Sequence, residues 1–265
     1  MMQEKDKMQE RNNKMENIFT DIYTKKSWGG KESISGRGSD LDHTHFIIDV
    51  LPEFFRKYNI KRLVDIPCGD MNWMNKIIHK WSIEEYIGMY IVDEIISNNV
   101  KQFGQPQITF QKADITKDLI PTSDLIFVRD CFIHFSFEDI FHAIENLKSS
   151  GSKYLLMTNG LMVTENEDIS TGQGRYLNFQ HSPFNFPKPL ESIVEKSPDK
   201  TLYNNKSLSL WKLEDIKIDA VEYYQNVLKI IRKKQQVKMR MLNETPLSEI
   251  LKIKFKKLFP SLITP

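Results

Sequence analysis

Residues 62–74, RLVDIPCGDMNWM, decide the fold. A short apolar run ends at a carboxylate, Asp65, and the turn Pro67-Cys68-Gly69 leads into residues with helical character. α/β sheets build nucleotide sites in this way, because the glycine lets a ligand approach the backbone and the first turn of a helix offers unpaired N–H groups. The stretch therefore predicts an α/β protein that binds an adenosine cofactor.

Strand-like and helix-like segments alternate along the rest of the chain. The predicted strands are Arg62–Ile66, Tyr86–Ile91, Thr109–Lys112, Leu125–Arg129 and Tyr154–Thr158, and the predicted helices are Thr44–Tyr58 (bent or restarted at Pro52), Trp73–Lys80, Asp93–Phe103 and Phe137–Ser149. This alternation is typical of a doubly wound, mostly parallel sheet. A later alternating run, Ser207–Leu213, predicts an antiparallel hairpin with a partner around Ser192–Lys196.

The composition limits the class of protein. With 265 residues, of which 40% are hydrophobic, the chain can form one large buried core. A formal net charge of +2 argues against a dedicated nucleic-acid binder. Cys68 and Cys131 form no CxxC pair, which predicts reduced thiols and no metal site. Since the chain shows neither a secretory signal nor an apolar run of membrane-spanning length, we expect a cytoplasmic protein.

The single glycine of the 67–69 turn separates the possible cofactors. A dinucleotide site needs three glycines spaced as GxGxxG, and a P-loop needs GxxxxGK followed by Ser or Thr; the chain has neither pattern here. A turn with one glycine suits S-adenosylmethionine better, because no pyrophosphate has to be wrapped.

Several motifs follow one another at ordinary spacing: DIPCGDMNWM, YIGMYIVDEII, ADITKD, FVRDCFIHFSFEDIFHAIENLKSSGSKYLLMT, RYLNFQHSPFNFP and SLSLWKL. With these motifs the chain resembles a family of small class I S-adenosylmethionine-dependent methyltransferases, from about Trp28 to Leu213. The resemblance implies a Rossmann-like sheet of seven strands with the cofactor across its carboxyl edge. Many members of the family are associated with glycans.

The resemblance also implies roles for single residues. Gly69 would lie against the cofactor, Asp65 would organise its methionine end, and Asp114 would accept from the adenine amino group. Each acid has a structural alternative, since Asp65 and Asp114 could serve their own turns and Asp70 could cap the following helix. The candidate cofactor-binding residues are Asp65, Pro67, Gly69, Asp70, Trp73, Tyr90, Asp114, Ile115 and Arg129.

Tyr90 departs from the family's pattern. At the end of the second strand such proteins usually carry an acid whose two oxygens bind both ribose hydroxyls, and a phenol offers one oxygen. Three readings stay open: Asp93 replaces the acid, the cofactor binds more weakly than usual, or the protein is a non-catalytic scaffold.

Asp130 and His134 follow the fourth strand, where the transferred methyl group should point. An alcohol acceptor must lose its proton, and a histidine, with a reference pKa of about 6.5, can take it. Asp130 could orient His134 or act as the base itself. The alternative is a structural histidine just before a helix that Ser136 caps.

Two segments supply candidate acceptor-binding residues. The irregular stretch 171–189 interleaves amides with aromatic side chains, which suits a hydroxyl-rich ligand such as a sugar. The alternative is a packed loop whose amides serve its own backbone. The segment 35–39, SGRGS, could form a lid whose arginine meets an anionic group or faces solvent. The candidates are Arg37, Arg175, Asn178, Gln180 and Asn185.

These observations predict a polar tail at residues 1–16, a methyltransferase domain at 17–218 and a basic C-terminal helical extension at 219–265. The leading functional hypothesis is O-methylation of a sugar or glycan precursor with S-adenosyl-L-methionine as cofactor. The alternatives are a phosphorylated or nitrogen-containing acceptor and a non-catalytic scaffold. The expected partner is a small-molecule or glycan acceptor, not a nucleic acid, and the extension suggests a homodimer or a weak membrane-surface contact.

Overall fold

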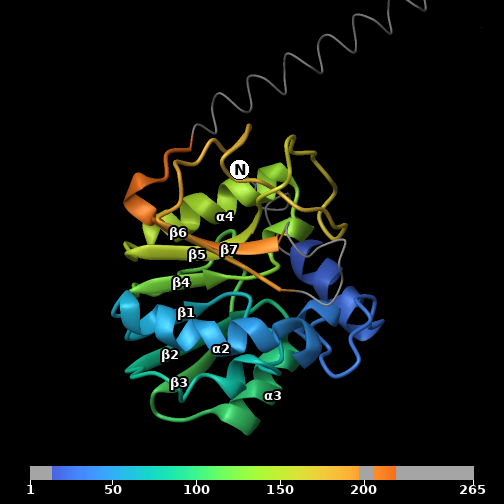
Figure 1. Ribbon diagram of the computed structural model, residues 1–265. Coiled ribbons are helices and arrows are strands. Elements are labelled where there is room, and N and C mark those ends of the chain that lie inside the picture. The colour runs from blue at the N-terminus through green and yellow to red at the C-terminus, as the bar shows by residue number, and fades with distance from the viewer. Residues whose placement is uncertain (1–13, 197–205, 219–265) are drawn as a thin grey trace, which may run out of the picture. The chain divides into compact units, whose positions relative to one another are not determined.

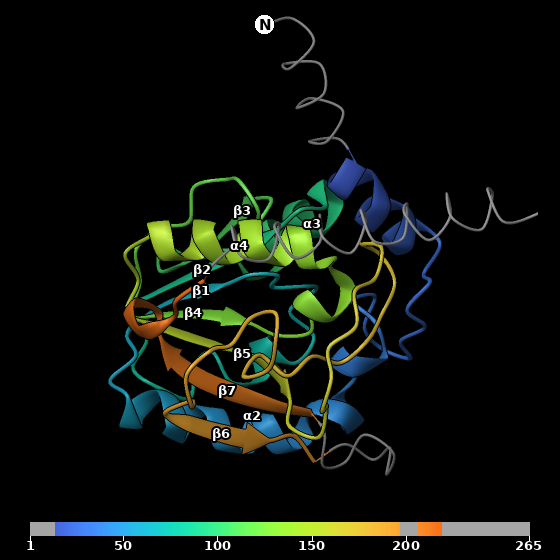
Figure 2. The ribbon, with the colours of Figure 1, turned by 90° about the horizontal axis from the view of Figure 1, so that it is seen from above.

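The computed structural model describes residues 14–196 and 206–218. The predicted C-terminal extension, with the dimer or membrane contact assigned to it, and most of the predicted polar tail lie outside the described residues. The described residues form three layers, in which helices cover both faces of a central sheet (Figures 1 and 2).

The sheet has seven strands in the order β3-β2-β1-β4-β5-β7-β6. Strands β1 to β5 pair in parallel, and β7 runs antiparallel to both β5 and β6. This arrangement confirms the predicted seven-stranded, mostly parallel sheet with an antiparallel late strand. The strands span Arg62–Asp65 (β1), Glu85–Tyr90 (β2), Ile108–Lys112 (β3), Leu125–Val128 (β4), Tyr154–Gly160 (β5), Glu191–Val194 (β6) and Lys206–Lys212 (β7).

Helix α2 covers one face of the sheet, and α3 and α4 cover the other (Figure 2). The helices span Leu41–Lys57 (α2), Asp93–Phe103 (α3) and Phe137–Ser149 (α4), with short 3-10 turns at Arg37–Ser39 (η1), Met74–Lys76 (η2), Phe132–His134 (η3) and Leu213–Asp215 (η4). Helix α2 continues through Pro52 without the predicted restart, because its buried side, which includes Leu51 and Phe55, packs on the domain. None of the helices within the described residues is long and apolar enough to cross a membrane.

The helix predicted at Trp73–Lys80 is wrong. The structure has only the 3-10 turn η2 there, with backbone hydrogen bonds of mixed i to i+3 and i to i+4 type. Gly69 and Met71 both have positive φ, 58° and 61°, so the chain turns twice before it can enter a helix. The apolar spacing reflects burial of the segment, whose buried side chains are Trp73, Met74, Ile77 and Ile78.

Residues ahead of the first predicted element also belong to the domain. Residues 14–24 are helical, and Met15 and Phe19 on this helix are buried. Glu16 forms an ion pair with Lys112 on β3, at 2.7 Å. The predicted boundary between tail and domain, at residue 16, therefore falls inside a packed helix.

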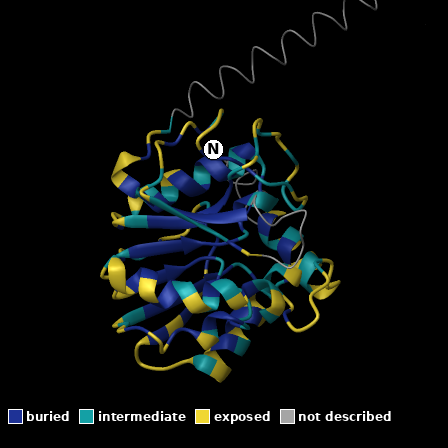
Figure 3. Ribbon diagram, viewed as in Figure 1, coloured by how far each residue is buried: buried dark blue, intermediate teal, exposed yellow. Residues whose placement is uncertain are grey.

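The strands form the buried centre of the domain (Figure 3), and the irregular stretch 171–189 extends that core. Phe179 and Phe184 are fully buried, with ring centroids 4.8 Å apart, and Phe186 meets Trp211 of β7 edge to face at 5.5 Å. The backbone N–H of Phe179 donates to the side chain of Asn159 on β5, at 2.9 Å. Phe179, Phe184 and Phe186 are thus packing residues beside β5 and β7.

We expect Phe179→Ala to lower the free energy of unfolding by about 3–5 kcal/mol, because it removes a fully buried ring and leaves a cavity between other rings. Leu119→Ala is the matched control, since Leu119 is 86% exposed; its cost should stay below about 0.5 kcal/mol. Chemical denaturation followed by circular dichroism measures both. Equal effects of the two substitutions would mean that the stretch lies outside the cooperative core.

Candidate active site

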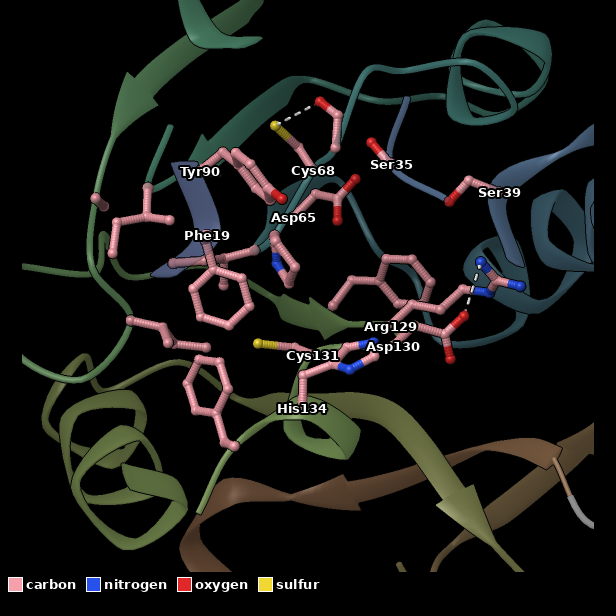
Figure 4. Close-up of a pocket in the computed structure, with 18 of the residues that line it drawn as sticks. Phe19, Ser35, Ser39, Asp65, Cys68, Tyr90, Arg129, Asp130, Cys131 and His134 are labelled. Atoms are coloured by element: carbon pink, nitrogen blue, oxygen red, sulfur yellow. Dashed lines mark hydrogen bonds and ion pairs between the residues drawn. The ribbon is translucent and has the colours of Figure 1, made fainter. Parts of the chain in front are cut away.

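A pocket of about 810 Å³ lies where the parallel strands end at the carboxyl edge of the sheet (Figure 4). We call it the first pocket. Residues that follow β1, β2, β3 and β4 line it together, because the carboxyl ends of parallel strands share one edge. The structure brings together here most of the predicted site residues: Asp65, Pro67, Gly69, Trp73, Tyr90, Asp114, Ile115, Arg129, Asp130 and His134.

Asp65 ends β1 as a buried acid inside this pocket. The hydroxyl of Tyr86 donates to its Oδ2 at 2.6 Å. Burial raises the pKa of Asp65 to about 7, against the opposing effects of the Tyr86 hydrogen bond and the Arg129 charge. A ligand cation placed beside Asp65 would therefore favour its ionised form.

Gly69 is needed because another loop comes close to it. Its φ is +58°, and a Cβ atom there would lie 2.6 Å from Oγ of Ser35. The same hydroxyl accepts a hydrogen bond from the Asp70 backbone at 2.9 Å. The turn after β1 and the loop that carries Ser35 thus form one wall of the first pocket.

Asp70 does not line the first pocket, although it was a candidate cofactor ligand. Its carboxylate accepts hydrogen bonds from the hydroxyl of Ser33 at 2.9 Å and from the backbone N–H of Ile34 at 2.8 Å. Because no α-helix follows directly, Asp70 has no helix to cap either. It holds the loop 33–35 against the turn after β1.

Tyr90 stands at the end of β2, within the first pocket, as the sequence pattern placed it. Burial is the main cause that raises the pKa of its phenol, so the side chain stays neutral. Asp93 forms an ion pair with Lys112 at 2.7 Å and does not line the pocket. The structure therefore gives no support to the reading in which Asp93 replaces the missing acid.

Asp114 serves its own turn, which was the structural alternative, and it also lines the first pocket. Its Oδ1 accepts hydrogen bonds from the backbone N–H and the hydroxyl of Thr116, at 2.9 and 2.6 Å, and Oδ2 lies 3.2 Å from Nζ of Lys117. It therefore stabilises its own turn while it faces the pocket beside Ile115.

Part of the pocket wall comes from residues that the sequence analysis did not assign. Met15 and Phe19 line the first pocket from the helix over residues 14–24, and the Phe19 ring packs on Phe135 with centroids 5.6 Å apart. The spacing of Met15 and Phe19, four residues apart, is the signal that could have found them.

Arg129 and Asp130 belong to a cluster of four charged side chains, completed by Glu195 and Lys206; we call it the charge cluster. Arg129 binds Glu195 through two nitrogens, Nη2 at 2.7 Å and Nε at 3.1 Å. Lys206 forms an ion pair with Asp130 and lies 3.4 Å from Glu195. Arg129, Glu195 and Lys206 are almost fully buried, and the cluster joins the end of β4 to the β6–β7 hairpin.

The charge cluster determines the protonation state of the Asp130 carboxyl group. Burial alone would raise the pKa of Asp130, but the charges of Lys206 and Arg129 lower it to about 2. A carboxylate this acidic is a poor proton acceptor at neutral pH. Asp130 is therefore ionised at neutral pH, and its hydrogen-bond and ion-pair partners are Lys206, Arg129 and Thr158 rather than the His134 ring.

His134 is held in one orientation. Its Nδ1 lies 2.8 Å from the backbone oxygen of Gln173, and its ring stacks on Trp28 with centroids 4.8 Å apart. Since a carbonyl oxygen can only accept, Nδ1 carries the proton and Nε2 carries the lone pair. Burial lowers the pKa of His134, so the ring is neutral at pH 7 and able to accept a proton. Ser136 caps α4, as the alternative stated, without preventing this role.

Four of the predicted acceptor-binding residues line neither the first pocket nor the second pocket described below. Arg175 donates to the backbone oxygens of Phe132 and Glu167, at 2.8 and 3.0 Å, and Asn178 accepts from the backbone N–H of Gln180 at 3.1 Å. The side chains of Gln180 and Asn185 are exposed. In this stretch the polar groups serve their own backbone, because a long loop over an aromatic core must pair its buried N–H and C=O groups. Arg175 and Asn178 are therefore engaged with the loop's own backbone, whereas Gln180 and Asn185 have exposed side chains that line neither pocket.

A second pocket of about 860 Å³ adjoins the first, and Arg37 lines it. The two pockets share five residues: Trp28, Ser35, Ser39, Asp130 and His134. The rest of its wall includes His43, Tyr176, Glu195 and Lys206. His134 thus faces both spaces, one at the strand ends and one beneath the segment 35–39.

No protein-family model and no curated protein matches the sequence. Solved structures are similar in fold. An S-adenosylmethionine-dependent methyltransferase from Leishmania major matches with a TM-score of 0.55 at 14% identity, over 75% of this chain and 82% of that chain. The protein TnmH matches with a TM-score of 0.50 at 10% identity, over 67% of this chain and 55% of that chain. The chain therefore has the fold of class I S-adenosylmethionine-dependent methyltransferases.

We expect Glu195→Gln to lower the free energy of unfolding by about 3–5 kcal/mol, because it leaves two buried cations facing a single carboxylate. Glu85→Gln is the matched control, since Glu85 and Arg62 form an ion pair whose side chains are 40% and 49% exposed; its cost should stay below about 1 kcal/mol. Denaturant titrations at pH 7 measure both. A Glu195→Gln protein as stable as the control would show that the cluster does not hold the hairpin.

Proposed function

We propose that this protein is an S-adenosylmethionine-dependent methyltransferase that acts on a hydroxyl group of a small molecule bound in the second pocket. The observation that carries the proposal is the wall shared by the two pockets. A neutral His134 and an ionised Asp130 stand on that wall, between the space at the strand ends and the space under residues 35–39.

The residues of the first pocket fit S-adenosylmethionine. Asp65 offers a buried acid for a cationic methionine end, Asp114 offers an acceptor for an amino group, and Ile115 offers an apolar surface for a ring. Gly69 keeps the backbone free of a side chain at the turn. Tyr90 offers one hydroxyl where a carboxylate would offer two oxygens. When bound, the cofactor supplies an electrophilic methyl carbon on a sulfonium, and its sulfur keeps the bonding electron pair when the methyl leaves.

The protein's own contribution is to position an acceptor hydroxyl and remove its proton. Nε2 of His134 is the acceptor for that proton, since the Gln173 carbonyl fixes the tautomer. Asp130 remains ionised throughout and stabilises the imidazolium that forms, because its charge raises the pKa of His134. Trp28 keeps the ring plane in place by stacking. This division of roles favours oxygen as the methylated atom.

The sugar or glycan acceptor remains a prediction. Of the amides named for it, Asn178 pairs with backbone groups of its own loop, and Gln180 and Asn185 have exposed side chains that line neither pocket. The part of the hypothesis that concerns an oxygen acceptor rests on His134, which does lie at the shared wall.

We expect the purified protein to bind S-adenosylhomocysteine, measured by isothermal titration calorimetry. At a concentration one hundred times its dissociation constant, the ligand should raise the free energy of unfolding by about 2.7 kcal/mol. ADP is the control, because the turn at Gly69 lacks the glycine pattern of a pyrophosphate site. Absence of both binding and stabilisation would refute the enzyme proposal.

A second candidate function is a non-catalytic scaffold that has kept the fold, and Tyr90 is the observation that favours it. The same titration separates the two functions when it is repeated with Tyr90→Asp. Binding by the natural protein favours the enzyme. Binding by Tyr90→Asp alone favours the scaffold.

We expect His134→Asn to lower kcat by about 10²–10⁴-fold with any acceptor that the natural protein methylates, because the general base is lost. The exposed His181 lies outside both pockets, so His181→Asn should leave kcat unchanged. Since the base must be neutral and its pKa is lowered, kcat/KM of the natural enzyme should stay level at neutral pH and fall only as the pH drops below about 6.5. An unchanged acid limb in His134→Asn would assign the proton to another group.

A further inference from the structure

The wall of the second pocket carries a cation, Arg37, that the proposed function does not use. The charge cluster contains two cations and two anions, which pair with one another at short distances. Arg37, on the same pocket wall, adds a third cation. His43 and His134 are both neutral at pH 7, because burial is the main cause that lowers the pKa of each. Arg129 does not itself line the second pocket, and the four charges of the cluster cancel one another. Arg37 is therefore the charge on this wall that has no carboxylate partner among the described residues.

We infer that the acceptor is an anionic hydroxy compound, whose carboxylate or phosphate group binds Arg37 while its hydroxyl faces His134. The inference rests on the proposed function, because His134 is the reason to place a hydroxyl at the shared wall. It adds the chemical class of the acceptor, which neither the fold nor the first pocket supplies.

The backbone of Arg37 is fixed on both sides. Its N–H lies 3.4 Å from the backbone oxygen of Trp28, and the next residue, Gly38, accepts a hydrogen bond from Nη2 of Arg129 at 2.9 Å. A Cβ atom on Gly38 would lie 2.9 Å from Oδ2 of Asp130. The segment 35–39 therefore lies directly on the charge cluster, and Arg37 is held beside the pocket without being part of the cluster.

Most N–H donors of the Arg37 guanidinium have no hydrogen-bond partner among the described residues. Its Nε donates to Nε2 of His43 at 3.2 Å, which is the guanidinium's one hydrogen bond to residues 14–196 and 206–218. Arginine has five N–H donors in a planar fork that matches two oxygens of a carboxylate or a phosphate. The bond to His43 orients that fork and leaves its remaining N–H groups for a ligand.

The charge balance also discriminates against an amine acceptor. The carboxylates on this wall, Asp130 and Glu195, already face Lys206 and Arg129, so a ligand ammonium would compete with buried ion pairs. An anion, in contrast, meets a cation that has no carboxylate partner among the described residues. The pocket therefore selects for negative charge on the acceptor.

Small probes of similar size test this inference: glycolate and 2-hydroxyethyl phosphate as anions, ethylene glycol as the neutral compound and ethanolamine as the cation. Each is titrated into the full-length protein saturated with S-adenosylhomocysteine at pH 7.5, with binding followed by ligand-observed NMR. We expect at least one anion to bind about tenfold or more tightly than ethylene glycol and ethanolamine. A preference for glycolate identifies a carboxylate as the natural group, and a preference for 2-hydroxyethyl phosphate identifies a phosphate.

Substitutions at Arg37 test whether this residue causes the preference for anions. Arg37→Gln should weaken binding of the preferred anion by about tenfold or more, and Arg37→Lys should retain part of the affinity, because it keeps the charge and loses the fork. Arg62→Gln, at the opposite end of β1, is the control and should change nothing. The affinity for S-adenosylhomocysteine should be the same in all four proteins, since Arg37 does not line the first pocket.

The inference is overturned if neither anion binds, if the neutral compound or the cation binds as well as the anions, or if Arg37→Gln binds them like the natural protein. Repeating the anion titrations without S-adenosylhomocysteine separates this inference from the proposed function. Anion binding that depends on Arg37 in a protein that does not bind S-adenosylhomocysteine would refute only the enzyme. Binding of S-adenosylhomocysteine without anion preference would refute only the acceptor class.

Discussion

The pairing of Arg129 with Glu195 is the contact on which most of the site depends. Arg129 directly follows the central strand β4 as a buried cation, and a buried cation is stable only if a matched anion and hydrogen bonds surround it. Glu195 supplies that anion from the β6–β7 hairpin, at the far edge of the sheet. The same four-charge arrangement keeps Asp130 ionised and receives the segment 35–39 through Gly38. The pairing of these buried charges thus connects β6 and β7, the end of β4 and the segment 35–39 that lines the second pocket.

The sequence predicted most of the fold because local signals determined it. Strands such as β4 are short apolar runs, and α4 has both a serine cap and a clear apolar face, so these elements were found nearly to the residue. The segment after β1 was mispredicted as a helix because its apolar spacing is helical while its backbone is not. Positive φ at Met71, a residue that seldom adopts it, carries no signal in sequence.

The site was predictable only where it sits next to a strand end. Asp65 and Tyr90 are the last residues of their strands and Asp114 lies two residues after β3, so topology alone brings them to one edge. Lys206 and Glu195 come from a hairpin whose register decides what they face, and register depends on tertiary packing rather than on local spacing. The amides of residues 171–189 carry an ambiguous signal, since a composition suited to binding a sugar is also what a long packed loop needs for its own backbone, as Asn178 shows.

The helix over residues 14–24 extends the folded domain, with its pocket wall, ahead of the motifs that resemble methyltransferases. The motifs that resemble methyltransferases begin near Trp28, yet Met15 and Phe19 form part of the first pocket's wall. A fragment trimmed to the recognisable motifs would retain all seven strands and would lose the part of the first pocket's wall that Met15 and Phe19 form. The boundary of similarity and the boundary of a closed binding site are therefore different positions in this chain.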